Sequence, residues 1–262
     1  MKISKYLIII FLGLLFSCSK DDVVVDDTNS VQKVVADIGG VVLTFDDDYV
    51  EDWKKADTKL RDYSWKATFC ICRIGIMNRD RMHTLQDFQN YGHEIAGHGA
   101  NHVNTLDYIA TNGFQKFYED EITPMMAKMN ANGLNVTSFA YPYGVRSNLT
   151  DEQLFKTFSV LRATTYGAYI PENQSCYYSR SKVVFGLGID DNYAHFSMPY
   201  ILDLLAYANS QHKILILYSH KPVEVVTENY QTKMENLVSI CNYVKQNHMR
   251  FYTLSDLSKI KG

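Results

Sequence analysis

The 262-residue chain lacks several features that mark particular classes of protein. No cluster of Lys and Arg reaches five residues, and the formal net charge is −3. Nucleic acid needs a concentrated basic surface, so we exclude it as a partner. Hydrophobic residues are 46% of the chain and charged residues 21%, which excludes a disordered, collagenous or multi-span membrane protein. No internal repeat and no Pro/Gly-rich linker follows residue 33, which predicts one domain over residues 34–262 and leaves the oligomeric state open.

Long apolar runs are also missing. The run Tyr6–Phe16 has eleven residues, whereas a membrane-spanning helix needs about 20. It follows two lysines and precedes a polar stretch, a pattern that predicts a cleaved export signal over residues 1–17. The sequence Leu15-Phe16-Ser17-Cys18 resembles a bacterial lipobox, which implies lipidation of Cys18 and a membrane as partner. Residues 18–33 are then an acidic tether, and we expect an outer-membrane or cell-surface lipoprotein of the bacterial cell envelope.

The remaining cysteines are few and do not have the spacing of a structural zinc site. They are Cys70, Cys72, Cys176 and Cys241. An exported protein could pair them as disulfides. Cys70 and Cys72 lie within an apolar run, however, and no second CxC or CxxC sequence accompanies them. We therefore predict buried free thiols.

Short apolar runs alternate with longer helical stretches after residue 33. The expected strands are 34–45, 67–72, 94–97, 138–141, 161–164, 183–187, 214–218 and 250–253. The expected helices are 49–60, 84–91, 114–131, 151–158, 198–211, 226–246 and 254–260, and Pro124 should bend or restart the third. This alternation favours βα units and a parallel sheet. Active sites of such folds lie at the carboxyl ends of the strands.

The first expected strand ends in three carboxylates, Asp46-Asp47-Asp48. Like charges repel at this spacing, and a bound cation would relieve the repulsion. The alternative is an exposed acidic turn that caps the next helix, because Asp is a common N-cap residue.

A pair of histidines follows the strand 94–97. His98 and His102 are four residues apart, so one helical turn would place both imidazoles on one face, a spacing that suits two ligands of a tetrahedral zinc ion. Two polar loop residues are the alternative. His93 could add a third ligand, but in a strand it would point away from His98.

The apolar strand 214–218 leads to His220. On its own, a histidine at the edge of the core is the better explanation of this residue, and the functional interpretation gains weight from the matching placement of the first two groups. One Asp and two His would give a metal three protein ligands and leave a position for water, as in catalytic zinc sites. A second carboxylate could then take a proton and a distant histidine could give one. The residues thus indicate metal-assisted hydrolysis of an amide or ester.

Several segments resemble the motifs of the polysaccharide deacetylases, which carry the NodB homology domain and form carbohydrate esterase family 4. Residues 44–48 (TFDDD) resemble the family's first motif, TFDDG, with Asp48 in place of Gly. Residues 92–95 (GHEI) precede His98 and His102, which resemble the second motif, HxxxH. Residues 139–144 resemble the third motif, and residues 218–220 loosely resemble the LxH fifth motif. The resemblance extends over roughly residues 34–258 and implies a distorted seven-stranded (β/α) barrel.

The resemblance assigns one role to each of six residues. They are Asp47, His98 and His102 as metal ligands, Asp46 as catalytic base, His220 as general acid, and Tyr143, whose backbone N–H would stabilise the oxyanion. The metal would be one divalent ion, zinc first, with cobalt, nickel or manganese as alternatives, because Asp/His₂ sites accept all of them.

Three further features depart from the family pattern. Ala140 stands where the third motif has an Arg that supports the base, and Arg180 is one candidate replacement. The fourth motif needs an Asp and a Trp. Asp190 and Asp191 are candidates for the Asp, and the two tryptophans, Trp53 and Trp65, lie too early in the chain. Tyr218 replaces the Leu that lines the acetyl pocket, so the acyl specificity is open.

We expect a metal-dependent hydrolase that removes N- or O-linked acetyl groups from an acetylated glycan outside the cytoplasm. The first alternative is a non-catalytic surface glycan-binding lipoprotein on the same barrel. A second keeps the metal but cleaves a non-carbohydrate amide. Chitin-like polymers, peptidoglycan, exopolysaccharide and acetyl-xylan all fit the sequence.

Overall fold

The computed structural model describes residues 39–168 and 170–260. The expected signal peptide, the lipidation site at Cys18 and the tether over residues 18–33 lie outside this part of the chain. Among the described residues, no helix combines the length and apolar character that crossing a membrane requires.

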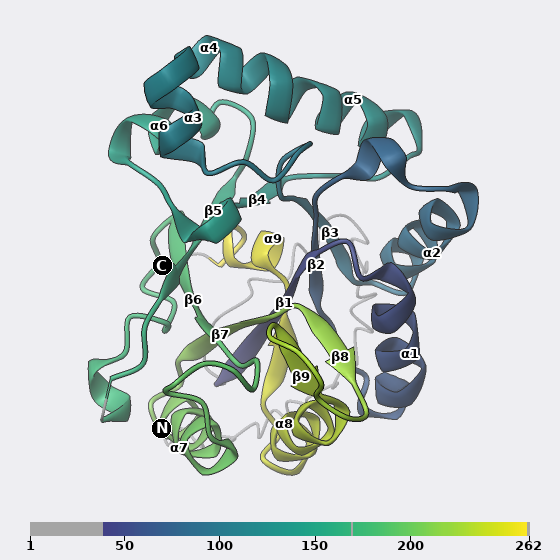
Figure 1. Ribbon diagram of the computed structural model, residues 1–262. Helices are drawn as coiled ribbons and strands as arrows, with labels where there is room; N and C mark the ends of the chain where they lie inside the picture. The colour runs from purple at the N-terminus through teal and green to yellow at the C-terminus, as the bar shows by residue number, and fades with distance from the viewer. Residues whose placement is uncertain (1–38, 169, 261–262) are drawn as a thin grey trace, which may run out of the picture. The chain divides into compact units, whose positions relative to one another are not determined.

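Seven parallel strands close into a barrel, and β1 (Gly40–Asp47) joins its two ends (Figure 1). Residues Thr44–Asp47 of β1 pair with β2 (Thr68–Ile71), and Gly40–Phe45 pair with β7 (Ile214–Ser219). The strands between them follow in chain order: β3 (Glu94–Gly97), β4 (Ser138–Ala140), β5 (Val160–Thr165) and β6 (Val183–Gly188). The fold class implied by the family resemblance is confirmed.

The barrel is distorted in two places. A further strand, β10 (Arg250–Tyr252), pairs with the first three residues of β1, before β1 meets β2. On the other side, β3 and β4 share a single paired position, Gly97 with Phe139. That paired position is the last residue of β3, directly before His98.

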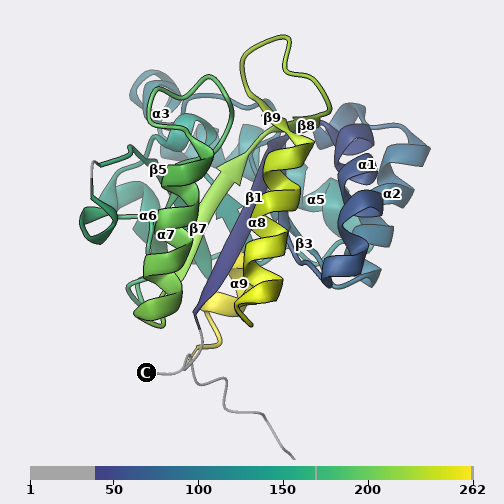
Figure 2. The ribbon, with the colours of Figure 1, turned by 90° about the horizontal axis from the view of Figure 1, so that it is seen from below.

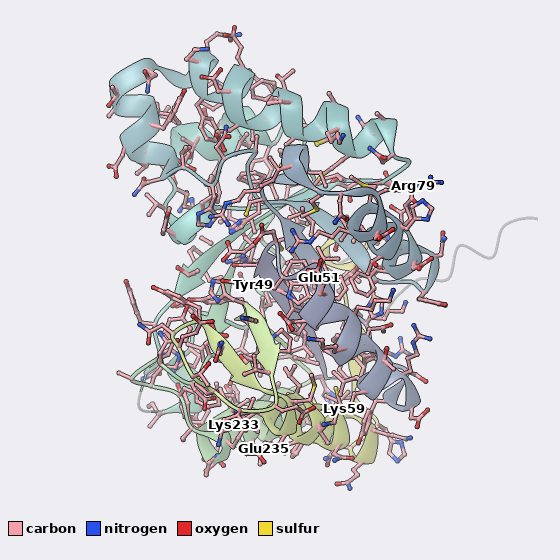
Figure 3. The ribbon with its side chains drawn as sticks, turned by 45° about the vertical axis from the view of Figure 1, so that its right-hand side comes forward. Tyr49, Glu51, Lys59, Arg79, Lys233 and Glu235 are labelled. Atoms are coloured by element: carbon pink, nitrogen blue, oxygen red, sulfur yellow. The ribbon has the colours of Figure 1, made fainter. Side chains whose placement is uncertain are left out.

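Helices surround the strands (Figures 1 and 2). They are α1 (Val50–Leu60), α2 (Arg79–Asn90), α3 (Thr105–Asn112), α4 (Phe114–Phe117), α5 (Thr123–Ala131), α6 (Asn148–Leu154), α7 (Met198–Ser210), α8 (Met234–Gln246) and α9 (Leu254–Leu257). Figure 3 shows α1 on the outside, with Tyr49 and Glu51 at its beginning and Lys59 near its end.

Three regions differ clearly from the expected elements. The helix expected over 114–131 is three pieces, because a π-helical segment, Tyr118–Ile122, separates α4 from α5. Pro124 lies in the first turn of α5, where its missing N–H removes no helical bond, so the expected restart is confirmed. Helix α3 was not anticipated, although Asn104 caps it by accepting from the N–H groups of Leu106 and Asp107.

The helix expected over 226–246 begins only at Met234. The residues before it form a small parallel sheet of β8 (Lys221–Val223) and β9 (Gln231–Lys233), with a loop between them that stands away from the barrel in Figure 2. This sheet extends the chain past the end of β7 and places Tyr230 beside the residues that follow that strand.

The strand residues alternate between two cores. Side chains such as Val41, Leu43 and Phe45 pack outward against the helices, while Val42 and Cys70 pack inside the barrel. The four described cysteines, Cys70, Cys72, Cys176 and Cys241, are buried and free, as predicted.

Candidate metal centre and active site

One cavity of about 300 Å³ opens at the carboxyl ends of the strands. Its lining contains all six residues to which the sequence assigns a role. The residues that line it are Asp46, Asp47, His98, His102, Tyr141, Tyr143, Gly144, Arg162, Thr164, Thr165, Tyr166, Tyr193, His195, Tyr218, His220 and Tyr230. β1, β5 and β7 and the loops that follow β3, β4 and β6 thus supply one site.

Asp47, His98 and His102 form a cluster that could hold a metal ion. One ligand atom from each lies within 4.8 Å of the others. Oδ1 of Asp47 is 3.1 Å from Nε2 of His102 and 3.8 Å from Nε2 of His98. Nδ1 of His98 is 2.8 Å from the carbonyl oxygen of Ala140. That acceptor fixes the proton on Nδ1 and leaves the lone pair of Nε2 for a metal. The donor set therefore fits a divalent ion.

The backbone departs from regular geometry where it presents these ligands. Asp47 has φ 84° and His102 has φ 62°, both in the left-handed region that non-glycine residues seldom adopt. In a regular strand, neighbouring side chains point to opposite faces. Asp46 and Asp47 are neighbours but line the same cavity, and the unusual φ of Asp47 accompanies this arrangement.

The charges of the cluster suit metal binding. Burial lowers the pKa of His98 to about 4, so its imidazole is neutral at neutral pH. Burial alone would raise the pKa of Asp47, but the hydrogen bond from His102 and the neighbouring histidines hold it well below its usual range. Asp48 points elsewhere, toward the guanidinium groups of Arg73 and Arg81, and gives α1 no side-chain cap.

Asp46 is buried and bound to an arginine. Nη2 of Arg162 donates to both carboxylate oxygens of Asp46, each at 2.5 Å. Burial would raise the pKa of Asp46, but the positive charge of Arg162, together with His98 and His220, lowers the pKa below its usual value, so the carboxylate is ionised. Arg180, the candidate from the sequence, is exposed and precedes β6, at the opposite end of the strands. The third motif has an arginine at the position of Ala140. In this chain Arg162 on β5 contacts Asp46 instead.

His220 is held by Asp190 from the loop after β6. Nδ1 of His220 is 2.6 Å from Oδ2 of Asp190, and the backbone N–H of His220 donates to Oδ1 of the same carboxylate. Burial opposes a charged imidazole, but the hydrogen bond and charge of Asp190 outweigh it and raise the pKa of His220. Of the two candidates, Asp190 is the partner; Asp191 accepts a hydrogen bond from Asn236 instead.

Trp53 also contacts this histidine, which the sequence did not indicate. Its indole N–H donates to the carbonyl oxygen of His220 at 2.7 Å, from a position in α1 that is 167 residues earlier. Because the two residues are far apart in the chain, no local sequence pattern indicates this contact. His93, considered as a possible ligand, lies before β3 and binds Asp57 through Nε2, away from the metal cluster.

Tyr143 lies in a tight turn after β4, with φ 58° and an exposed ring. Its ring is 4.8 Å from that of His102. The next residue, Gly144, also has a positive φ, and a Cβ there would collide with the side chain of Thr164. The turn therefore requires glycine, and it holds the backbone of Tyr143 at the edge of the cavity.

Aromatic side chains form the wall beside His220. The Tyr218 ring lies 5.2 Å from the guanidinium carbon of Arg162 and 5.7 Å from the ring of Tyr193. Tyr193 in turn stacks on His195, whose Nε2 is 2.8 Å from the carbonyl oxygen of Gly188. His195 lies in the loop after β6 and also lines the cavity.

Comparisons with known proteins point to one family. Residues 33–157 match the family model described as polysaccharide deacetylase. Among curated protein sequences, none matches this chain significantly.

Solved structures with the same fold are distant in sequence. The Xyl-CE4 domain of a multidomain xylanase from the hindgut metagenome of Trinervitermes trinervoides has 20% identity and a TM-score of 0.53, over 84% of this chain and 89% of that one. The catalytic domain of a peptidoglycan N-acetylglucosamine deacetylase from Eubacterium rectale has 14% identity and a TM-score of 0.52, over 82% and 88%. The peptidoglycan deacetylase PdaC from Bacillus subtilis has 14% identity and a TM-score of 0.53, over 87% and 93%.

Proposed function

We propose that the chain is a member of the polysaccharide deacetylase family, whose model matches residues 33–157, and that it is a metal-dependent hydrolase that removes N- or O-linked acetyl groups from a polysaccharide or oligosaccharide. One observation carries the proposal. The Asp47–His98–His102 cluster shares a single cavity with an ionised Asp46 and a histidine of raised pKa, His220. Two groups in one cavity whose pKa values are shifted in opposite directions are the usual mark of a general acid and a general base.

Asp46 is the base in this proposal. Its carboxylate is ionised, and Arg162 fixes its orientation from inside the barrel. It takes a proton from the water that attacks the acetyl carbonyl. A metal bound by Asp47, His98 and His102 would supply Lewis-acid polarisation of that carbonyl.

His220 is the acid. Asp190 holds Nδ1, so Nε2 is the nitrogen that gives a proton to the departing amine or hydroxyl. The raised pKa keeps the imidazole protonated to a higher pH than an ordinary histidine. The backbone N–H of Tyr143, at the edge of the same cavity, would donate to the oxyanion as it forms.

The rim of the cavity suits a sugar. Tyr166 is 91% exposed, Tyr143 64% and Tyr230 50%, and all three line the cavity. Exposed aromatic rings offer flat apolar faces with a polar edge, which match the two sides of a pyranose ring. This aromatic rim favours a carbohydrate over a non-carbohydrate amide.

We also propose that the protein acts at the cell envelope, as an outer-membrane or cell-surface lipoprotein. This location rests on the sequence of residues 1–33 alone. Mass spectrometry of the protein from membranes should find an acylated Cys18 at the new N-terminus. An unmodified Cys18 would contradict the proposed anchor.

The reaction is tested by acetate release from residues 19–262, loaded with zinc, across N- and O-acetylated glycans. Asp46→Asn should lose turnover yet keep the metal, because Asp46 is outside the ligand set. Removal of the metal with a chelator should stop acetate release, and added Zn²⁺, Co²⁺, Ni²⁺ or Mn²⁺ should restore it. Glycan binding without acetate release from metal-loaded protein would favour the non-catalytic glycan-binding alternative. Unchanged turnover in the Asp46→Asn variant would refute the assigned base.

A further inference from the structure

We propose that Glu121 is a positioning residue for the metal ligands, because it holds the loop between His98 and His102 in its ligand-presenting shape. The proposal rests on the metal dependence proposed above and concerns how this chain builds that site. Glu121 comes from the π-helical segment Tyr118–Ile122, which no sequence motif singled out. Segments of this kind inside helices often occur at functional sites.

Both carboxylate oxygens of Glu121 bind one residue of the loop. Oε2 accepts from the backbone N–H of Asn101 at 2.9 Å, and Oε1 accepts from Nδ2 of the Asn101 side chain at 2.7 Å. The backbone carbonyl of Glu121 accepts from the N–H of Ala100 at 3.1 Å. Three hydrogen bonds therefore join one buried residue to two consecutive positions between the two histidines.

The Glu121 carboxylate forms hydrogen bonds with the loop and no ion pair with a described residue. Glu121 is 1% exposed, and within residues 39–168 and 170–260 no Lys, Arg or His lies at ion-pair distance from it. A buried charge without hydrogen bonds is strongly unfavourable. The N–H donors of Asn101 are what make this position tolerable, so carboxylate and loop depend on each other.

The loop has a shape that needs such support. Gly99 has φ 82° and His102 has φ 62°. A non-glycine residue in the left-handed region persists only when its surroundings hold it there. Asn101, which Glu121 binds through both its backbone and its side chain, immediately precedes His102. Glu121 thus holds the residue directly before His102, the proposed ligand whose φ is positive.

Gly99 fits the same carboxylate. A Cβ on Gly99 would lie 2.7 Å from Oε2 of Glu121, closer than real Cβ atoms approach an oxygen. The residue that follows His98 therefore leaves room for the Glu121 side chain to reach Asn101. Carboxylate, glycine and asparagine form one matched arrangement around the two metal ligands.

The test is zinc affinity, measured by titration of the metal-free protein against a competing chelator, together with the melting temperature of the metal-free protein. Glu121→Ala should weaken zinc binding by about 10–100-fold, the usual effect of removing a group that orients a ligand. Glu121→Gln should retain most of the affinity. Its oxygen can accept from the Asn101 N–H, and its NH₂ can donate to Oδ1 of Asn101 once that amide turns.

Asp57→Ala is the matched control. Asp57 is also buried, and it binds Arg61, Trp65 and His93. His93 precedes β3, whereas His98 follows it, so this cluster lies at the other end of the strand. Asp57→Ala should lower the melting temperature and leave the zinc affinity unchanged. A loss of affinity in this control equal to that in Glu121→Ala would mean that general destabilisation explains both.

Asn101→Ala carries the test if Glu121→Ala does not fold. It removes the Nδ2 contact but keeps the backbone N–H, so we expect a smaller loss of zinc affinity in the same direction. Unchanged affinity in folded Glu121→Ala, or in Asn101→Ala when Glu121→Ala does not fold, would overturn the role of Glu121 alone. A wild-type protein that binds no divalent metal would overturn the metal dependence itself, which separates the two failures.

Discussion

Arg162 and Asp46 are 116 residues apart in the chain, and the Arg162 guanidinium donates to both oxygens of the Asp46 carboxylate inside the barrel. Arg162 is fully buried, and its Nε and Nη1 atoms have no hydrogen-bond partner among the described residues. Asp46 is thus the one acceptor that the described structure gives this charge. The two residues form a pair in which each compensates the burial of the other.

The first prediction concerns the stability of this pair. Arg162→Leu should lower the free energy of unfolding by about 3–5 kcal/mol, because it leaves an unpaired buried carboxylate. Asp46→Asn/Arg162→Leu should recover part of that loss, since the remaining side chain is neutral. Urea denaturation of the four members of this cycle measures the coupling. Additive effects of the two changes would show that the pair contributes nothing beyond its separate members.

The second prediction moves the arginine. Ala140 pairs in register with Arg162 on the neighbouring strand, and its side chain belongs to the core inside the barrel. Arg162→Ala should reduce turnover strongly, because Asp46 loses its orienting partner. Ala140→Arg in that background should restore part of the turnover by returning the guanidinium to the position where the family resemblance places it. Acetate release compares the three proteins, and equal activity of the single and double variants would count against an orienting role for the guanidinium.

The third prediction is a shift in pH dependence. The pKa of His220 is raised, so activity that needs the protonated imidazole should fall as the pH rises through that value. Asp190→Asn removes the negative charge that raises the pKa, while its amide oxygen can still accept a hydrogen bond from Nδ1 of His220; burial, which lowers the pKa, remains. The alkaline limb of kcat/KM should move to lower pH by about 1–3 units.

Asp191→Asn provides the control for that measurement. Asp191 is the next residue and binds Asn236, with no contact to His220. Its pH profile should match that of the wild type. An Asp190→Asn profile with the same alkaline limb as the wild type would remove His220 as the titrating acid.

The fourth prediction concerns the acyl group. Tyr218 is 7% exposed and packs between Arg162 and Tyr193 at the wall of the cavity. Tyr218→Leu shortens this side chain and leaves more room for the acyl group. The ratio of kcat/KM for a propionylated substrate to kcat/KM for the acetylated one should therefore be about 10-fold higher in the variant than in the wild type. Tyr177→Leu, a buried tyrosine that packs on Tyr207, should leave the ratio unchanged. The measurement is kcat/KM for a propionylated and an acetylated form of the same glycan. An unchanged ratio in Tyr218→Leu would show that Tyr218 does not limit the acyl group.

Much of the barrel follows from the sequence, because buried parallel strands are short apolar runs. β3 has the expected bounds, β2 is one residue shorter than expected at each end, and β7 is one residue longer at its carboxyl end. The sheet β8–β9 was missed because strands of three residues carry too little pattern. The residues from 226 to 233 were instead expected to belong to the helix that begins at Met234.

The site was predictable where a role depends on residues close in sequence. The spacing of His98 and His102 and the adjacency of Asp46 and Asp47 are enough to indicate the cluster from the sequence alone. Arg162 was missed, although a charged residue among the apolar residues of β5 was a usable signal, since alternation places it on the inward face. Glu121 and Trp53 gave no such signal, because their contacts arise only when distant helices pack beside the loops.

The adjacency of Asp46 and Asp47 has a consequence for how such an enzyme diversifies. One peptide unit, about 3.8 Å between Cα atoms, separates Asp46, the proposed base, from Asp47, the proposed metal ligand. Covalent geometry therefore sets this spacing, and no change in loop length can retune it. For the proposed deacetylase, we expect new substrates to be accommodated by changes in the rim around Tyr166 and Tyr193, while Asp46 and Asp47 stay in place. The backbone of β1 thus fixes the spacing of the proposed reacting groups, whereas the rim residues can change independently of it.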